Sequence, residues 1–172
     1  VPVRQWVLSL PIPLRLLLAA QPELITPVLQ VVHRLIKGHL LKRAGLAPDQ
    51  GQGGAVTLIQ RFGSAANLNI HLHCLVLDGV YRRDADGAPR FVAVDAPSDK
   101  ELAALLQTLI SRLMKLLVRR GVLEQDGEQC WPAESNTDQA QSLWALQSAA
   151  VTYRIAFGPR AGQRVLTLRG AP

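Results

Sequence analysis

Stretches that alternate between apolar and polar positions give way to stretches with helical spacing along this chain. Residues 4–11 (RQWVLSLP) are rich in β-favouring residues, alternate weakly and end at a proline, which predicts a strand. Thr26 and Pro27 are predicted to be the N-cap and the first residue of a helix. The apolar positions that follow recur at helical spacing: Val28, Val31, Val32, Leu35 and Ile36. Gly45 predicts the end of this helix.

The middle of the chain holds four β-like runs. Residues 55–62 (AVTLIQRF) and 67–77 (NLNIHLHCLVL) flank a Gly-Ser pair that suits a hairpin turn. Residues 80–83 and 90–94 flank an Asp-Gly turn in the same way. Together these runs predict an antiparallel meander.

The clearest helical signal begins at Ser98, which forms a capping box with Glu101. Gly121 is predicted to end this helix. Its apolar face consists of Leu102, Leu105, Leu106, Leu109, Leu113, Leu116 and Leu117. The remaining predicted elements are a loop at 124–138, a helix at 139–150 and strands at 151–157 and 164–168. This mixture predicts a single α+β domain over residues 1–172, an antiparallel β-sheet with helices packed on one face.

The run at 67–77 places two kinds of side chain on opposite faces of its strand, because successive strand residues point to opposite sides. One face is entirely apolar: Leu68, Ile70, Leu72, Cys74 and Val76. The other face carries Asn67, Asn69, His71 and His73. Imidazoles two residues apart lie about 7 Å apart along a strand. They can bind one metal ion when a third ligand arrives from a neighbouring strand, and imidazole suits Mn, Zn, Fe or Ni better than Mg. Spacing alone leaves open two half-exposed histidines without a ligand.

Composition narrows the class of protein. Hydrophobic residues make up 48% of the 172 residues and charged residues 19%, which excludes a disordered chain. The net charge is +6, and a basic surface favours polyanions, with nucleic acid ahead of an anionic membrane surface. The two cysteines, Cys74 and Cys130, cannot build a disulfide framework, so we expect reduced thiols in a cytoplasmic protein. No apolar run approaches the ~18 residues of a membrane span, so no membrane partner is expected.

The segment NLNIHLHCLVLDG resembles the His-hydrophobe-His motif of the HUH endonuclease superfamily. Taken with RQWVLSLP, LIQRFGSAANLNIHLHCLVLDGVY and TYRIAFGPRAG, it makes the chain similar to rolling-circle, two-tyrosine transposases of the insertion sequence ninety-one group. The resemblance covers nearly all of the chain and implies an HUH-endonuclease-like catalytic domain. It also implies DNA transposition by metal-dependent nicking and joining of single-stranded DNA at transposon ends, through a phosphotyrosine intermediate.

The resemblance further implies that His71 and His73 hold a divalent ion, Mg or Mn, which polarises the scissile phosphate. Gln60, across the predicted hairpin, is the expected third ligand, and Asp78 is the other candidate. By alternation Gln60 shares a face with three residues that look like core, Val56, Leu58 and Phe62. A β-bulge could turn Gln60 toward the histidines; otherwise it is a polar residue at the edge of the core.

The nucleophile is where the sequence departs from the family. The chain contains two tyrosines, Tyr81 and Tyr153. Both lie in strand-like runs, and we interpret them as packing residues. In the family the catalytic tyrosine lies on a helix well after the histidine motif. We therefore expect it beyond Pro172, so that these residues form an incomplete catalytic domain, a fragment that is inactive alone.

Basic residues suggest where DNA would bind. Arg112, Lys115 and Arg119 share one helix face, and Arg160 lies in the GPRAG turn. We expect them to contact phosphates, with a solvated surface as the alternative. Two other functions stay open: a non-catalytic, basic DNA-binding domain with an unused histidine pair, and a metal-dependent hydrolase that activates a bound water.

Overall fold

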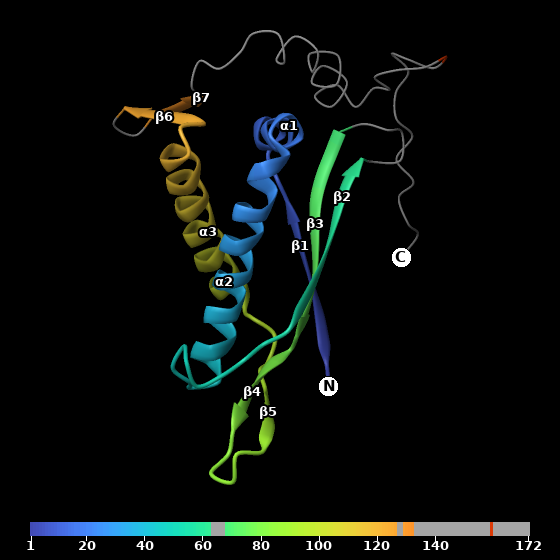
Figure 1. Cartoon of the computed structure of the whole chain (residues 1–172), viewed down its shortest axis with the longest axis vertical. Helices are drawn as coiled ribbons and strands as arrows, with labels where there is room; N and C mark the ends of the chain where they lie inside the picture. Colours follow the sequence, from blue (N-terminus) through green and yellow to red (C-terminus); the bar gives the residue numbers. More distant parts are fainter. Residues whose placement is uncertain (63–67, 127–128, 133–158, 160–172) are drawn as a thin grey trace. The chain divides into compact units, whose positions relative to one another are not determined.

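The computed structural model of the chain describes residues 1–62, 68–126, 129–132 and 159. Its elements are β1 (Val3–Ser9), α1 (Ile12–Ala20), a 3₁₀ turn (Pro22–Leu24), α2 (Ile25–Arg43), β2 (Ala55–Phe62), β3 (Leu68–Leu77), β4 (Gly79–Arg83), β5 (Pro89–Ala93), α3 (Asp99–Arg119), β6 (Leu123–Asp126) and β7 (Gln129–Pro132) (Figure 1). The predicted α+β class is confirmed. The described residues fall into two compact units, one with 1–6, 24–57 and 74–132, the other with 7–23 and 58–73. The predicted helix at 139–150 and the strands at 151–157 and 164–168 lie outside the described residues.

Three strands form the sheet that carries the histidine motif, in the order β1-β3-β2 with antiparallel neighbours (Figure 1). β3 is therefore the central strand. Its predicted alternation is confirmed, since Ile70, Leu72 and Cys74 are at most 1% exposed while His71 and His73 are half-buried. The predicted turn at 63–64 lies outside the described residues.

In the first unit, helix α2 covers the inner face of the sheet. Its apolar stripe is buried: Ile25, Val28, Val32, Leu35, Ile36, Leu40 and Leu41. From β1, the ring of Trp6 lies edge-on to that of His39, with centroids 6.3 Å apart. From β2, the Thr57 hydroxyl lies 2.7 Å from Nε2 of His33. These contacts fix which face of the sheet is covered.

The predicted start of α2 is wrong, although its end is confirmed. The helix begins at Ile25, directly after the 3₁₀ turn, so Thr26 and Pro27 lie inside its first turn and no side chain caps it. Proline is tolerated there because first-turn N–H groups have no helical partner. Gly45 ends the helix with φ 69°, and its N–H donates to the Lys42 carbonyl at 3.2 Å.

Helix α1 is absent from the sequence prediction because prolines at 11 and 13 interrupt the apolar run. Both fall at its very start, where proline breaks no helical hydrogen bond. Within the described residues no single helix is long and apolar enough to cross a membrane; only α1 and α2, taken as a bent pair, meet that length and composition.

The predicted pairing of residues 80–83 with 90–94 is confirmed by the β4–β5 hairpin, where Tyr81 lies opposite Phe91. The single meander is wrong, because β4 and β5 form their own two-stranded sheet. The chain turns away from the three-stranded sheet at Asp78–Gly79. Only glycine fits at position 79 without a shift, because a Cβ there would lie 2.2 Å from the carbonyl oxygen of Val92.

The C-terminal part of the described chain contains one confirmed helix and one missed hairpin. Helix α3 has the predicted capping box at Ser98, and Gly121 follows it with φ 67°. Only the second half of its leucine face is buried; Leu102 and Leu106 are 41% and 49% exposed. The predicted loop is wrong over β6 and β7, which pair as an antiparallel ribbon. Each of these strands has only 4 residues, too few for an alternating pattern to stand out in the sequence.

Candidate metal centre and nucleic-acid interface

The two histidines of β3 stand side by side on the outer face of the sheet. The centroids of His71 and His73 are 6.3 Å apart, with their planes tilted by 38°. Metal–nitrogen bonds of about 2.1 Å bring two imidazoles somewhat closer than this, so the two rings would have to move together to bind one ion. Within the described residues no group of three or more His, Cys, Asp or Glu could hold a metal ion.

Gln60 shares this outer face, contrary to the expectation that its neighbours belong to the core. Val56 and Leu58 are 63% and 60% exposed, and Gln60 is exposed as well. Thr57, on the opposite face of β2, donates a hydrogen bond to the Cys74 thiol at 3.2 Å. The core prediction is wrong because nothing among the described residues covers this face of β2, and Gln60 therefore needs no bulge to share the histidines' side.

The contacts between β2 and β3 also indicate a register. The Leu77 N–H donates to the Gly54 carbonyl at 3.0 Å, and three residues further along each strand Thr57 meets Cys74. Both contacts follow one antiparallel register. Continued without a bulge for three more residues, it sets Gln60 opposite His71. Directly opposite residues have Cβ atoms about 5 Å apart, close enough to share an ion.

Asp78, the other candidate ligand, is engaged elsewhere. Both of its carboxylate oxygens accept hydrogen bonds from Arg4, one of them from Nε at 2.8 Å. This hydrogen bond raises the pKa of Arg4 above its usual value. The Asp78 N–H also donates to the Pro2 carbonyl, so Asp78 joins the end of β3 to the start of β1.

A short polar chain that sequence reasoning missed lies behind the histidine strand. The His33 ring and the Thr57 hydroxyl are hydrogen-bonded, and Thr57 in turn bonds to the buried Cys74. This chain of hydrogen bonds connects α2 to β2 and β3. Cys74, its member on β3, directly follows His73 in the sequence. The available signal was the helical spacing from His33 to the buried Ile36 and Leu40, which places that histidine on the inner face of its helix.

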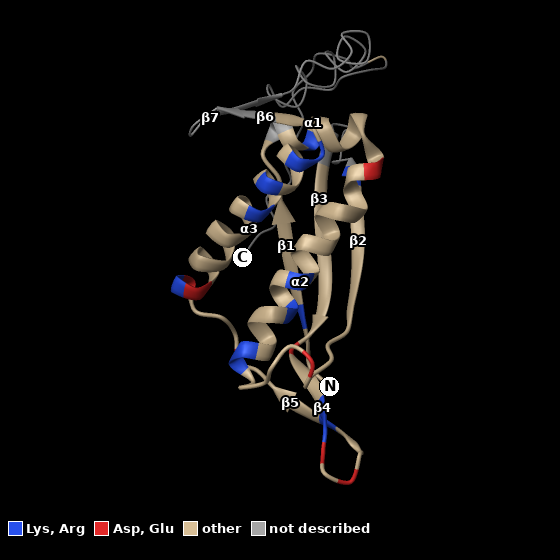
Figure 2. Cartoon of the chain, turned by 60° about the vertical axis from the view of Figure 1, so that its left-hand side comes forward, with Lys and Arg blue, Asp and Glu red and all other residues tan. Residues whose placement is uncertain are grey.

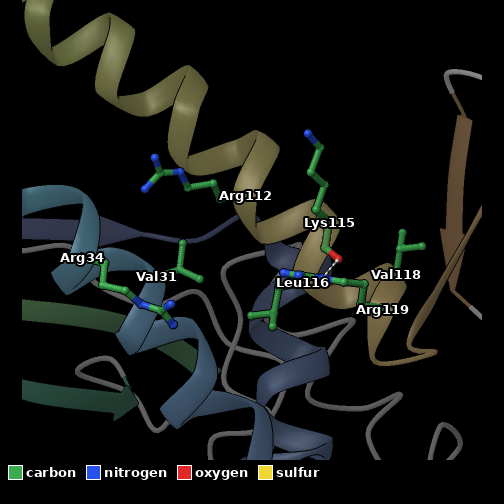
Figure 3. Close-up of a pocket in the computed structure, with 7 residues that line it drawn as sticks. All are labelled: Val31, Arg34, Arg112, Lys115, Leu116, Val118 and Arg119. Atoms are coloured by element: carbon green, nitrogen blue, oxygen red, sulfur yellow. Dashed lines mark hydrogen bonds between the residues drawn. The ribbon is translucent and has the colours of Figure 1, made fainter. Parts of the chain in front are cut away.

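Four basic residues of the two long helices line one space, although the Lys115 side chain extends away from α2 (Figure 3). Arg112, Lys115 and Arg119 of α3 and Arg34 of α2 line one cavity of about 480 Å³ (Figure 3). Figure 2 shows all the basic residues of α3 except Lys100 toward its C-terminal end, whereas its acidic residues lie in the first turn. Arg160, the other predicted DNA contact, lies outside the described residues.

Tyr81 is a packing residue, as expected. Its ring meets that of Phe91 edge-on, with centroids 5.1 Å apart, and its backbone exchanges hydrogen bonds with Gln52. Tyr153 lies outside the described residues.

A family model described as "Putative transposase" (Y2_Tnp) matches residues 54–166. This span is more than half of the chain. The chain belongs to this transposase family. No curated protein and no solved structure matches it. Membership of this family indicates that the protein functions in DNA transposition and is a DNA-processing enzyme.

The matched span of this transposase contains the candidate metal site. Gln60, His71 and His73 lie within it, and so does the whole of α3. Helix α2, which supports the inner face of the sheet and contributes Arg34 to the basic cavity, precedes it.

Proposed function

We propose that this transposase nicks and rejoins single-stranded DNA at transposon ends by the rolling-circle mechanism of HUH endonucleases. The observation that supports it is the pair of imidazoles on the open face of the central strand, with Gln60 on the same face of the neighbouring strand. The proposed cofactor is Mg or Mn, and the proposed location is the cytoplasm.

The donor set fits a divalent ion that must act on a phosphate. Neutral imidazoles of His71 and His73 and the neutral amide oxygen of Gln60 would bind the ion without cancelling its charge. A bound ion would polarise the scissile phosphate. The buried Ile70, Leu72 and Cys74 fix the strand from behind, so that the backbone carrying the two histidines would keep its place when the phosphate approaches.

The attacking group in this proposal is a tyrosine hydroxyl. Its oxygen bonds to phosphorus while the bond from phosphorus to the 3′ oxygen breaks, which leaves a 5′-phosphotyrosine and a free 3′-hydroxyl. Tyr81 is not suited to this role, because its ring packs against Phe91. We propose that the nucleophile lies beyond Pro172 and that residues 1–172 alone do not cleave.

Metal binding tests the central step. Titration of the chain with Mn²⁺, followed by electron paramagnetic resonance, should show one site. His71→Ala should weaken binding at least tenfold, roughly the loss seen when a metal site loses a key group. His39→Gln is the matched control, since it replaces a half-buried histidine on α2. Equal Mn²⁺ affinity in His71→Ala and the unaltered chain would overturn the proposal, and the non-catalytic DNA-binding domain would take its place.

A further inference from the structure

The cavity between α2 and α3 combines cations with an apolar floor. Its basic residues are Arg34, Arg112, Lys115 and Arg119, and its apolar residues are Val31, Leu116 and Val118 (Figure 3). Among the described residues, none that lines it is acidic. Since both helices belong to the same compact unit, the arrangement is a property of that unit alone.

Across the described part of the chain, none of these four cations forms an ion pair. Salt bridges occur elsewhere, as between Arg43 and Glu101 at 3.2 Å. Gathering like charges without a counter-charge is unfavourable, and a bound polyanion relieves the repulsion. The four residues therefore form a site with affinity for anions rather than a balanced surface.

Two of the guanidinium groups are already held in place. Nε of Arg34 donates to the Gln30 carbonyl at 3.0 Å, and Nε of Arg119 donates to the Lys115 carbonyl at 3.1 Å. These bonds leave the terminal nitrogens available as donors. Guanidinium donors in a fixed fork match phosphate oxygens, and their immobilisation lowers the entropy lost on binding.

The apolar floor decides between forms of nucleic acid. A duplex keeps its bases stacked and presents mainly phosphates and sugars, whereas a single strand also offers unstacked bases, which can stack on guanidinium planes and contact apolar side chains. A cavity of about 480 Å³ is of the size that takes small molecules, which suits about one or two nucleotides of one strand.

We propose that this α2–α3 groove is a phosphate-binding subsite for single-stranded DNA, built from elements other than those that carry the histidine pair. The choice of DNA as the ligand rests on the proposed function. The groove holds the strand by its backbone, so it contributes affinity that is independent of sequence and of metal.

Binding of a labelled oligothymidylate of about 20 nucleotides to the 172-residue chain, measured by fluorescence anisotropy in EDTA, tests the groove. The salt range is about 50 to 200 mM. Arg112→Gln with Arg119→Gln should weaken binding roughly tenfold and lower the salt slope by about 1.4, since each single-strand phosphate contact contributes about 0.7. Arg34→Gln should weaken binding as well, because α2 forms the other wall.

The matched control is Lys100→Gln with Arg120→Gln, which removes two charges from α3 and its C-cap outside the groove. It should change affinity less than about threefold. Equal losses in control and groove variants, or no loss in the groove variants with unchanged melting curves, would overturn the proposal. A duplex of equal length that binds as tightly would overturn the single-strand assignment. Because EDTA removes the metal, groove-dependent binding can hold even if the Mn²⁺ titration rules out the proposed function.

Discussion

At the scale of single residues, the candidate site depends on which way a few side chains of the sheet point. His71 and His73 point outward because Ile70, Leu72 and Cys74 are buried on the other side of the same strand. Gln60 points outward for the corresponding reason on β2, where the intervening Thr57 bonds to Cys74. Regular alternation along β2 from Thr57 then puts the Gln60 amide on the face of the imidazoles.

Gln60→Ala tests this placement. If the amide oxygen is a ligand, its removal should weaken Mn²⁺ binding about tenfold, whereas Gln60→Glu should strengthen binding because it adds a charged oxygen. Leu58→Ala is the control, as it truncates an exposed side chain on the same face of β2. Isothermal titration calorimetry of the three variants would measure this, and an affinity of Gln60→Ala equal to that of Leu58→Ala would exclude Gln60 as a ligand.

At the scale of elements, the strands β1 to β5 and helix α3 were predictable because their signals are local, whereas β6 and β7 were missed. Alternation in β3 and the capping box at Ser98 depend only on neighbouring residues. The direction in which Gln60 faces was not predictable, since whether Val56 and Leu58 are buried depends on what covers the sheet. The role of Asp78 was not predictable from local signals either, because its hydrogen-bond partner Arg4 lies far away in the sequence.

The contact between β1 and α2 gives the fold a dependence on pH. His39 lies against Trp6, and among the described residues its buried Nε2 has no hydrogen-bond partner. Burial lowers the pKa of His39 below its usual value; Glu101 opposes this shift, while Arg43 and Lys42 add to it. The unfolded chain therefore takes up this proton at a higher pH than the folded chain does.

The contribution of neutral His39 to the free energy of unfolding should accordingly be fully present above about pH 6.5, the pKa of an unfolded histidine. It should be lost as the pH drops toward the lowered pKa of His39 in the folded chain. His39→Leu should flatten this decline, because an apolar side chain takes up no proton. Urea midpoints at about pH 7.5 and pH 5 would measure the difference. His73→Gln should leave the decline in place, and an equally steep decline in His39→Leu would show that another group causes it.

At the scale of the whole molecule, some basic residues form ion pairs with acidic residues and others do not. Arg4, Arg43 and Arg82 lie in ion pairs with Asp78, Glu101 and Asp84. The cations of the groove, in contrast, share a cavity to which the described part of the chain contributes no acidic side chain. Four cations that form no ion pair among the described residues thus line the groove where the proposed DNA strand would bind, and this supports a transposase whose affinity for DNA and whose chemistry reside in different elements.

That separation predicts what the 172-residue chain does with DNA. Supplied with Mn²⁺ and single-stranded DNA labelled at its ends, it should bind the strand and yet form no covalent adduct, because Tyr81 packs against Phe91 and the proposed nucleophile lies beyond Pro172. A chain extended past Pro172 to include a downstream tyrosine should form an adduct that survives denaturing electrophoresis, and Tyr81→Phe in that chain should not reduce it. An adduct that is formed by residues 1–172 and lost in Tyr153→Phe would instead identify Tyr153 as the nucleophile. Clean hydrolysis without an adduct would favour attack by a water molecule, because a hydrolase leaves no bond between protein and DNA.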